Sequence, residues 1–455
     1  MNRKVLIIYD ENSRDISLSN FNETKIQFFN VNTEDDFYNF TIKYFSDKYD
    51  LIVIPCSLGD IHTNYAGIKL GICIRLIQDS NKNKYTPIIF ISSDSFEEIL
   101  SITLEASILS AAGSYLSLPN KHKIESISVN ARVINSHVFK TNVLKRIFLT
   151  KPPQVGSHSI ANEWGVYRLA KIGCYHLPKP KSNLYLEYLK NIYDYSENEL
   201  DVNEVKSYKI KFKETLKKIK NIKILYVDDD KDKGWELVLK EVFKDAIKSN
   251  GNFVAVDTEE KGINEISFSE WDLILLDLRL SAPEESLSAA SSINRFAGGR
   301  LLKLAKELNP SIPVIIITAS NKIWNLENVI EIGADGYYIK ESPEYSIDLR
   351  YSMDNYINFL NNISAILEKS RYLKWFWSHC KEIKENIKLN YKSNEEFGNR
   401  ISEKLDIAFG LLRHKQNSFD KKYLFTDYEL AFLTLWSTLN EFSYANITEE
   451  KNNEK

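Results

Sequence analysis

The stretch NIKILYVDDDKDKG, residues 221–234, decides the fold of this chain. Its short, largely apolar run ends in three consecutive aspartates, Asp228, Asp229 and Asp230. An apolar run followed at once by carboxylates is typical of a buried parallel strand whose carboxyl end opens into a polar crevice. Three adjacent carboxylates repel one another, so the stretch also predicts a positive partner nearby.

Four more apolar runs follow, separated by stretches with helical spacing: GNFVAVD, WDLILLDLR, IPVIIITAS and GYYIKES. This alternation predicts a doubly wound α/β domain with a parallel sheet over residues 221–365. Residues 1–123 repeat the plan with KVLIIYDEN, YDLIVIPCS, TPIIFISSD and GSYLSLPN. Residues 124–220 are expected to form a mainly helical connector, and 366–455 a C-terminal all-α module.

The composition is that of a soluble globular protein, with 43% hydrophobic and 27% charged residues over 455 positions. A net charge of −3 gives no sign of nucleic-acid binding. No apolar run approaches the roughly 18 residues that would span a bilayer. The four cysteines are scattered and are expected to be reduced thiols. We therefore expect a cytoplasmic protein with no membrane partner.

Polar side chains stand where the predicted strands of the 221–365 domain end. Asp228 and Asp229 follow the first strand, Asp277 the third, Thr318 the fourth and Lys340 the fifth. Carboxylate oxygens with open positions suit Mg²⁺, and a carboxylate beside such an ion can attack phosphorus. A hydroxyl and an ammonium group would hydrogen-bond and neutralise the phosphoryl oxygens. A metal-dependent phosphoryl site at this edge of the sheet is the prediction.

These residues resemble those of the receiver domain of bacterial two-component response regulators. YVDDD resembles the family's acidic pair, which implies Asp229 as direct metal ligand and Asp228 as its acidic neighbour. LILLDLRL resembles the phosphoacceptor strand, which implies phosphorylation of Asp277 and a metal bond from the Arg279 backbone carbonyl.

The later motifs extend the resemblance. IIITAS supplies Thr318 as the switch hydroxyl, and GYYIKESP supplies Lys340 as the phosphate-pairing lysine and Tyr337 as the aromatic switch. The resemblance implies a flavodoxin-like fold, Mg²⁺ as cofactor, and phosphorelay signalling to the helical module. It implies a sensor histidine kinase or phosphotransfer protein as donor and an output partner of unknown identity. Catalysis would be limited to self-phosphorylation from a donor and autodephosphorylation.

The chain departs from the family pattern in two places. Glu341 and Ser342 stand between Lys340 and Pro343, where the family usually has a proline directly after the lysine and a cis peptide. The loop at 281–299 is long, which favours a mobile insertion over a lid or partner-binding element.

The first domain lacks the residues that aspartyl-phosphate formation requires. Pro55 occupies the phosphoacceptor position, Ser92 the hydroxyl position and Ser117 the lysine position. The domain resembles a degenerate, or pseudo-, receiver. We favour a docking or dimerisation surface, which would allow a homodimer, over a ligand site formed by Asp10, Glu11, Asp60 and His62.

One further candidate lies in the connector. His158 and Asn162 share a face of a predicted helix, which is similar to the phosphoacceptor helices of histidine kinases. A packed or solvated histidine is the favoured interpretation, because two residues make a weak motif.

Two other function classes remain open. The chain could be a non-enzymatic scaffold or phosphate sink, or an effector with an unrecognised active site in its helical regions. Neither helical region has a nucleophile–base pair or a phosphate loop, and no basic recognition helix suggests a DNA-binding output.

Overall fold

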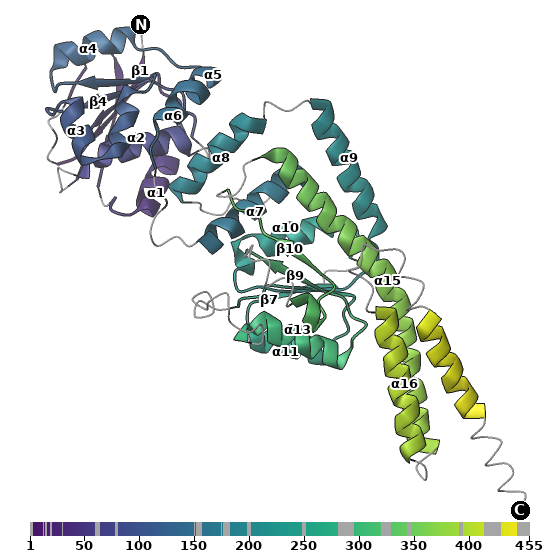
Figure 1. The fold of residues 1–455 in the computed structure, drawn as a ribbon. Helices are drawn as coiled ribbons and strands as arrows, with labels where there is room; N and C mark the ends of the chain where they lie inside the picture. The colour runs from purple at the N-terminus through teal and green to yellow at the C-terminus, as the bar shows by residue number, and fades with distance from the viewer. Residues whose placement is uncertain are drawn as a thin grey trace, which may run out of the picture. The chain divides into compact units, whose positions relative to one another are not determined.

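The structure, a computed structural model, divides the chain into two compact units, each described here by itself (Figure 1). The first unit comprises residues 1–160, 179–201 and 343–349, and the second comprises 161–178, 202–342 and 350–455. The residues that the structure describes are 3–11, 13, 16–18, 21–29, 31–59, 64–77, 81–149, 151, 157–173, 175, 183–197, 202–247, 252–280, 295–319, 329–343, 348–390, 395–413 and 429–443.

A five-stranded parallel sheet forms the centre of the first unit, in the order β2-β1-β3-β4-β5. Its strands are β1 (Lys4–Tyr9), β2 (Asn22–Gln27), β3 (Leu51–Pro55), β4 (Ile88–Ile91) and β5 (Ser114–Ser117). Side chains alternate between two cores, so that Leu6 packs on one face and Val5 on the other. Both faces are buried, as a parallel sheet with helices on each side requires.

The helices of the first unit follow the strands and complete the two layers. They are α1 (Glu34–Tyr44), α2 (Ala66–Leu76), α3 (Phe96–Ile102), η2 (Leu104–Ser110), α4 (Lys121–Asn130), α5 (Ser136–Val138), the π-helical turn η3 (Phe139–Val143), α6 (Leu144–Arg146) and α8 (Leu184–Glu197). Three N-cap side chains fix helix starts: Thr33 and Ser95 form capping boxes, and Asn120 accepts a bond from Lys123 N–H.

The second unit repeats this topology. Its parallel sheet has the order β10-β9-β8-β6-β7. The strands are β6 (Ile224–Val227), β7 (Phe253–Val256), β8 (Leu273–Leu276), β9 (Val314–Thr318) and β10 (Gly336–Ile339). Each unit thus has the flavodoxin-like strand order 2-1-3-4-5, in which the crevice for a ligand opens between the first and third strands, here β6 and β8. The predicted fold class, two doubly wound parallel sheets with further helices, is confirmed.

The helices of the second unit include its longest element. They are α7 (Ser157–Gly173), α9 (Val202–Lys218), η4 (Lys231–Lys233), α10 (Trp235–Val242), α11 (Glu259–Phe268), α13 (Ala297–Leu308), α15 (Leu349–Asn390), α16 (Glu395–Arg413) and helical segments at 329–332 and 429–443. The 42 residues of α15 contain no glycine or proline, so nothing interrupts the helix at the predicted boundary between residues 365 and 366. In the described residues, no helix is long and apolar enough to cross a membrane.

The predicted connector at 124–220 is divided between the units instead of forming a module of its own. Helix α8 packs in the first unit, where Leu184 joins the core and Asn191 donates to the Leu76 carbonyl at 3.0 Å. Most of α7 and all of α9 belong to the second unit. The physical reason is burial, since Trp164 of α7 is fully enclosed and Phe212 of α9 is 3% exposed.

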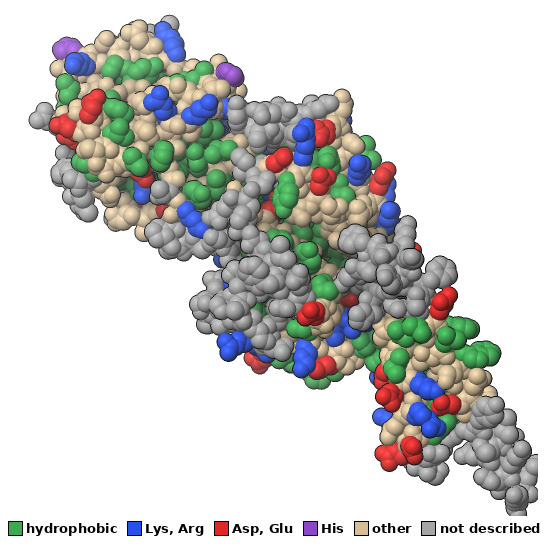
Figure 2. Space-filling view, in the orientation of Figure 1, with side chains coloured by type: hydrophobic (Ala, Val, Ile, Leu, Met, Phe, Trp, Pro, Cys, Tyr) green, Lys and Arg blue, Asp and Glu red, His purple; other side chains and the backbone are tan. Residues whose placement is uncertain are grey.

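The distal part of α15 packs with α16 and helix 429–443 around a small core of its own that includes Phe376, Ile401 and Ala431. Large apolar side chains also stand at the surface of these helices, among them Trp375, Phe432 and Trp436 (Figure 2). The C-terminal helices therefore share a core, and α15, the helix that follows β10, extends into it without a break.

Candidate functional site

Three carboxylates meet at the carboxyl ends of β6 and β8. One oxygen each of Asp228, Asp229 and Asp277 lies within 4.8 Å of the other two. Asp228 and Asp277 are fully buried. They are adjacent because β6 and β8 pair in register up to Val227 and Leu276, the residues just before them. The sequence prediction that these strand ends converge is therefore consistent with the structure.

Lys340, directly after β10, supplies the positive charge. Its Nζ lies 2.7 Å from Asp228 Oδ2 and 2.9 Å from Asp277 Oδ2, and all three side chains are fully buried. Burial alone would lower the pKa of Lys340, but the two carboxylates outweigh it and raise the pKa. The ammonium group stays charged and offsets part of the repulsion between the carboxylates. The Trp235 ring centroid, 5.4 Å from Nζ, closes another side of the ammonium group.

Asp228 and Asp229 differ in how their oxygens are used. Asp228 accepts hydrogen bonds from the Tyr226 hydroxyl and from the Asp230 backbone N–H, the latter at 2.8 Å, besides the contact with Lys340. Asp229 Oδ1 is buried and has no hydrogen-bond partner among the described residues. Burial, and then the charges of Asp277 and Asp228, raise the pKa of Asp229 to about 7. Asp228 is held in place, whereas Asp229 keeps a carboxylate oxygen available.

This donor set fits Mg²⁺. It consists of oxygen atoms only, and hard divalent cations prefer oxygen ligands with positions left open for water and phosphate. Asp229 has a buried oxygen without a hydrogen-bond partner among the described residues, and its pKa is raised by burial and by like charges. A bound cation would give that oxygen a partner and would favour the charged carboxylate.

The other predicted site residues lie around this cluster. Thr318, the last residue of β9, is 1% exposed, and its carbonyl accepts a bond from the Lys340 backbone N–H at 2.7 Å. The Arg279 N–H donates to Asp277 Oδ1 at 3.4 Å, and its guanidinium lies over the Phe296 ring. Tyr337 on β10 is 46% exposed, so its ring points away from the core.

Two predicted features fall wholly or partly outside the described residues. His158 lies in α7, but the structure does not describe its side chain. Residues 281–294 of the long loop are not among the described residues. Where the loop enters α13, Gly298 is packed tightly against the site, because a Cβ there would lie 2.1 Å from the Asp277 carbonyl oxygen. No cis peptide bond occurs in the described part of the chain, so the turn after Lys340 is built differently from the expected family turn.

Helix α7 reaches the acidic loop, which the sequence did not predict. Asn162 Nδ2 donates to Asp230 Oδ2 at 2.6 Å. A Cβ at Gly165 would lie 2.7 Å from the Trp235 ring, so the helix can approach this closely only because the residue is glycine. The signal in the sequence was Asn162 itself, which stood out only through its spacing from His158.

The departure at Glu341 has a structural role. Its carboxylate is 3.6 Å from Arg168 Nε of α7 and accepts bonds from Ser352 Oγ (2.6 Å) and Asn355 Nδ2 (3.1 Å) of α15. Both charged side chains of this pair are buried, at 0% and 2% exposure. The residue next to Lys340 thus ties α7 and α15 to the end of β10, where the family usually has proline.

At the corresponding edge of the first unit, the described residues form no cluster of carboxylates with a lysine. The Asp10 carboxylate accepts bonds from Gly59 N–H and Ser13 N–H, both at 2.6 Å. Pro55 ends β3, and Ser117 donates its hydroxyl proton to the Leu118 carbonyl at 3.0 Å. Asp60 and His62, from the proposed ligand site, lie outside the described residues.

Comparisons with known proteins agree with this division. Residues 4–117 match the family model described as Inactive Receiver domain. The chain is 33% identical over 129 residues to the transcriptional regulatory protein CiaR of Streptococcus pneumoniae, which is 28% of this chain and 48% of that protein. The chain thus spans about half the length of this curated relative.

Solved structures of receiver domains are also similar. The CheY-like response regulator receiver domain of Methanospirillum hungatei JF-1 matches over 33% of this chain and 98% of its own, at 21% identity and a TM-score of 0.24. The receiver domain of the Francisella response regulator 1452 covers 32% of this chain and 99% of its own, at 25% identity and a TM-score of 0.21.

The predicted resemblance is confirmed at the level of the domain family. Residues 4–117 of the first unit are similar to the inactive receiver family, and the chain is similar over 129 residues to a transcriptional regulatory protein.

Proposed function

We propose that this chain is a two-component response regulator whose second unit accepts a phosphoryl group on Asp277. The observation that carries the proposal is the fully buried Lys340 ammonium held between Asp228 and Asp277, beside the available oxygen of Asp229. Shifted pKa values, such as that of Asp229, also occur in ion pairs with a purely structural role. Here, however, three carboxylates and one lysine lie together at a strand-end crevice, and this is the charge pattern that phosphoryl transfer needs.

In the reaction, an oxygen of Asp277 attacks the phosphorus of a phosphohistidine on a donor protein. The O–P bond forms as the P–N bond breaks, and the imidazole leaves with the electron pair and takes a proton from water. The donor is a sensor histidine kinase or a phosphotransfer protein. Lys340 pairs with the new phosphoryl oxygens, since its ammonium group already lies within hydrogen-bond distance of Asp277. The Thr318 hydroxyl donates a hydrogen bond to the same phosphoryl group.

Mg²⁺ would be held by Asp229, Asp277 and the Arg279 carbonyl, with Asp228 as the acidic neighbour. When bound, the ion neutralises charge on the transferred phosphoryl group. Asp228 positions the cluster, because Tyr226 and the Asp230 N–H fix its carboxylate.

Phosphorylation replaces the single negative charge of the Asp277 carboxylate with a phosphoryl group that carries nearly two, next to Thr318 and Lys340. We propose that Thr318 then moves toward the phosphoryl oxygens and that Tyr337, exposed at present, turns inward. The shift would reach α15 and so the C-terminal helices. The inactive first unit serves as a docking or dimerisation surface, since its acidic and serine side chains are engaged by the backbone.

Intact-mass measurement after treatment with a small phosphodonor and Mg²⁺ tests the assignment. The wild-type chain should gain one phosphoryl group, and Asp277→Asn should gain none. Asp10→Asn, the same aspartate-to-asparagine change at a strand end of the first unit, is the matched control and should gain one group as the wild type does. A phosphoryl group mapped to His158, or an unmodified wild-type chain, would refute the proposal.

A further inference from the structure

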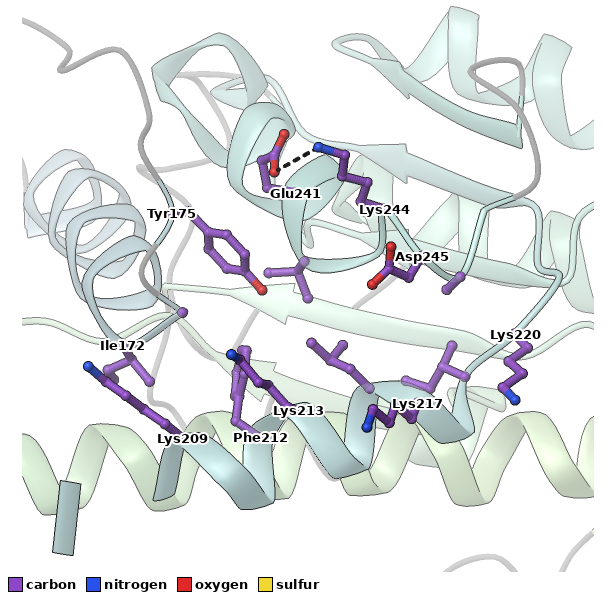
Figure 3. Close-up of a pocket in the computed structure, with 15 residues that line it drawn as sticks. Ile172, Tyr175, Lys209, Phe212, Lys213, Lys217, Lys220, Glu241, Lys244 and Asp245 are labelled. Atoms are coloured by element: carbon purple, nitrogen blue, oxygen red, sulfur yellow. Dashed lines mark ion pairs between the residues drawn. The ribbon is translucent and has the colours of Figure 1, made fainter. Parts of the chain in front are cut away.

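A groove outside the phosphoryl site lies within the second unit. Its volume is about 540 Å³, and it is bounded by the end of α7, by α9 and by the end of α10 with the turn that follows (Figure 3). Its floor is apolar and includes Ile172, Leu216 and Val242. A hollow of this size with an apolar floor can accept the side chains of a bound partner.

The rim of the groove is strongly basic. Five lysines line it, Lys209, Lys213, Lys217, Lys220 and Lys244, against only two carboxylates. Of the five, Lys244 has an ion-pair partner, Glu241 at 3.7 Å. The four lysines of α9 and the turn after it pair with no carboxylate within the part of the chain that the structure describes. A concentration of positive charge in a chain of net charge −3 points to an anionic ligand.

The lysines form a row. This arrangement suits a ligand that carries several anionic groups along its length better than a single compact anion. Figure 3 shows Lys209, Lys213, Lys217 and Lys220 following one another along one side of the groove, with Lys244 on the other. The first three are four residues apart on α9, so each step along the axis is about 6 Å. Acidic residues four apart on a partner helix have the same spacing. A single phosphate would instead require ammonium groups that converge on one point.

The floor argues against nucleic acid as the occupant. Single-stranded nucleic acids stack their bases on exposed aromatic rings. Two aromatic residues line the groove, and one of them, Phe212, is only 3% exposed. Aliphatic side chains between basic rims instead suit an amphipathic helix with one apolar and one acidic face.

We propose that the groove formed by α7, α9 and α10 docks an acidic amphipathic helix of a partner protein. The apolar face of that helix lies on Leu216, which is half-buried, and its glutamates or aspartates meet Lys209, Lys213 and Lys217. The groove would give the receiver unit a binding surface separate from the site at Asp277, and its occupation does not depend on phosphorylation.

Fluorescence anisotropy with the full chain tests this surface. The probe is a labelled 16-residue helical peptide with glutamates four residues apart on one face and leucines on the other. Two control peptides have the same composition in scrambled order, or serines in place of the leucines. The designed peptide should bind, both controls should bind at least about tenfold more weakly, and affinity should fall as salt rises.

Charge-reversal variants locate the binding. Lys213→Glu with Lys217→Glu should weaken the designed peptide about tenfold. Lys206→Glu with Lys218→Glu, on α9 but outside the groove lining, makes the same charge change and should alter affinity less than about twofold.

Three outcomes would overturn the proposal. They are an equal loss in the two double variants, equal binding of the scrambled peptide, and tighter binding of an oligothymidine that displaces the designed peptide. The last result would identify a nucleic-acid surface. Equal thermal melting of the two double variants would exclude unfolding as the cause of a difference.

Discussion

At the residue scale, the charge balance of the aspartate cluster in the second unit depends on one buried cation, Lys340. Lys340 forms an ion pair with both Asp228 and Asp277, and none of the three side chains is exposed. The sequence was sufficient to predict these residues, because each follows an apolar run and the ends of parallel strands meet at one edge. The sequence could not predict the contacts of Asn162 or Glu341. Their hydrogen-bond partners are 68 residues and 11 or more residues away, respectively, and are brought close only by packing.

Removing the ammonium group of Lys340 should destabilise the unit strongly. Lys340→Met leaves two buried carboxylates without compensation, a change that typically costs about 3–5 kcal/mol. Urea unfolding followed by tryptophan fluorescence measures it. The seven tryptophans all lie outside the residues of the first unit, so the signal reports the second unit alone.

Mg²⁺ should restore part of the stability of Lys340→Met, since a bound cation replaces the missing positive charge. Lys261→Met is the control, because the Lys261 side chain is 58% exposed and its partner Asp257 is 33% exposed, and its effect should stay within about 1 kcal/mol. An unfolding free energy unchanged by Lys340→Met in the presence of a chelator would contradict the assigned role.

The raised pKa of Asp229 predicts how Mg²⁺ binding depends on pH. Asp229 is protonated below about pH 7, because burial and the charges of Asp277, Asp228 and Asp230 outweigh the attraction of Lys340. A neutral carboxyl is a poor ligand, so Mg²⁺ affinity should fall as the pH drops from 8 to 6, by up to about tenfold per unit below pH 7.

The same shift affects folding in the absence of metal. The folded-state pKa lies above the unfolded value of about 3.9, so the metal-free unit should lose stability as the pH rises from about 4 to about 7. Isothermal titration at pH 6, 7 and 8 measures the affinity. Asp229→Asn should bind more weakly and lose most of the pH dependence, and an equal pH dependence in both proteins would rule Asp229 out as the titrating group.

At the element scale, two features of the fold could not be found in the sequence. The edge strand β2 has no apolar run, because it lies at the rim of its sheet and its side chains are half-buried or exposed. The sequence predicted helix α7 as part of a connector. In the structure, contacts of Arg168 with Glu341 and of the Gly165 carbonyl with Tyr356 attach it to the second unit. Local sequence specifies strands buried on both faces well, whereas docking of a helix depends on distant partners.

The buried pair of Arg168 and Glu341 should hold α7 and α15 together. Arg168→Met leaves the Glu341 carboxylate buried without its cation, and we expect a loss of about 3–5 kcal/mol. The double variant Arg168→Met with Glu341→Gln should lose less than the sum of the two single variants, by about 0.5–3 kcal/mol. Urea unfolding followed by tryptophan fluorescence gives each value, and hydrogen exchange should rise in α7.

A second ion pair serves as the control for this cycle. Arg350 Nε lies 2.7 Å from Glu204 Oε1, but the two side chains are 56% and 30% exposed. Arg350→Met should therefore cost no more than about 1 kcal/mol. Strictly additive effects of Arg168→Met and Glu341→Gln would show that the two residues are not coupled.

At the scale of the whole molecule, the chain contains two sheets of one topology, and only the second combines a carboxylate cluster with a buried lysine in the described residues. The first unit, which is similar to the inactive receiver family, keeps the cores that build the fold but has Pro55 and Ser117 where aspartyl-phosphate chemistry would require aspartate and lysine. Under the proposed function, the molecule changes state at Asp277, and the change begins in the second unit.

Beryllofluoride with Mg²⁺, a phosphate mimic, distinguishes a switch from a scaffold or phosphate sink. A ligand shifts a protein between two states only if its contacts differ in those states. The mimic adds charge beside Lys340, whose neighbour Glu341 binds α15 and whose strand carries Tyr337. We therefore expect altered hydrogen exchange at Tyr337 and along α15, and almost none in residues 4–117.

Asp277→Asn is the control for this experiment and should show no change with the mimic. The extent of the response decides between the two functions, because α15 runs without interruption from Leu349 to Asn390, into the core of the C-terminal helices. A response that reaches this core would make the helices an output element. A response confined to the residues next to Asp277 would leave them unaffected by the charge, and the chain would then act as a scaffold or phosphate sink.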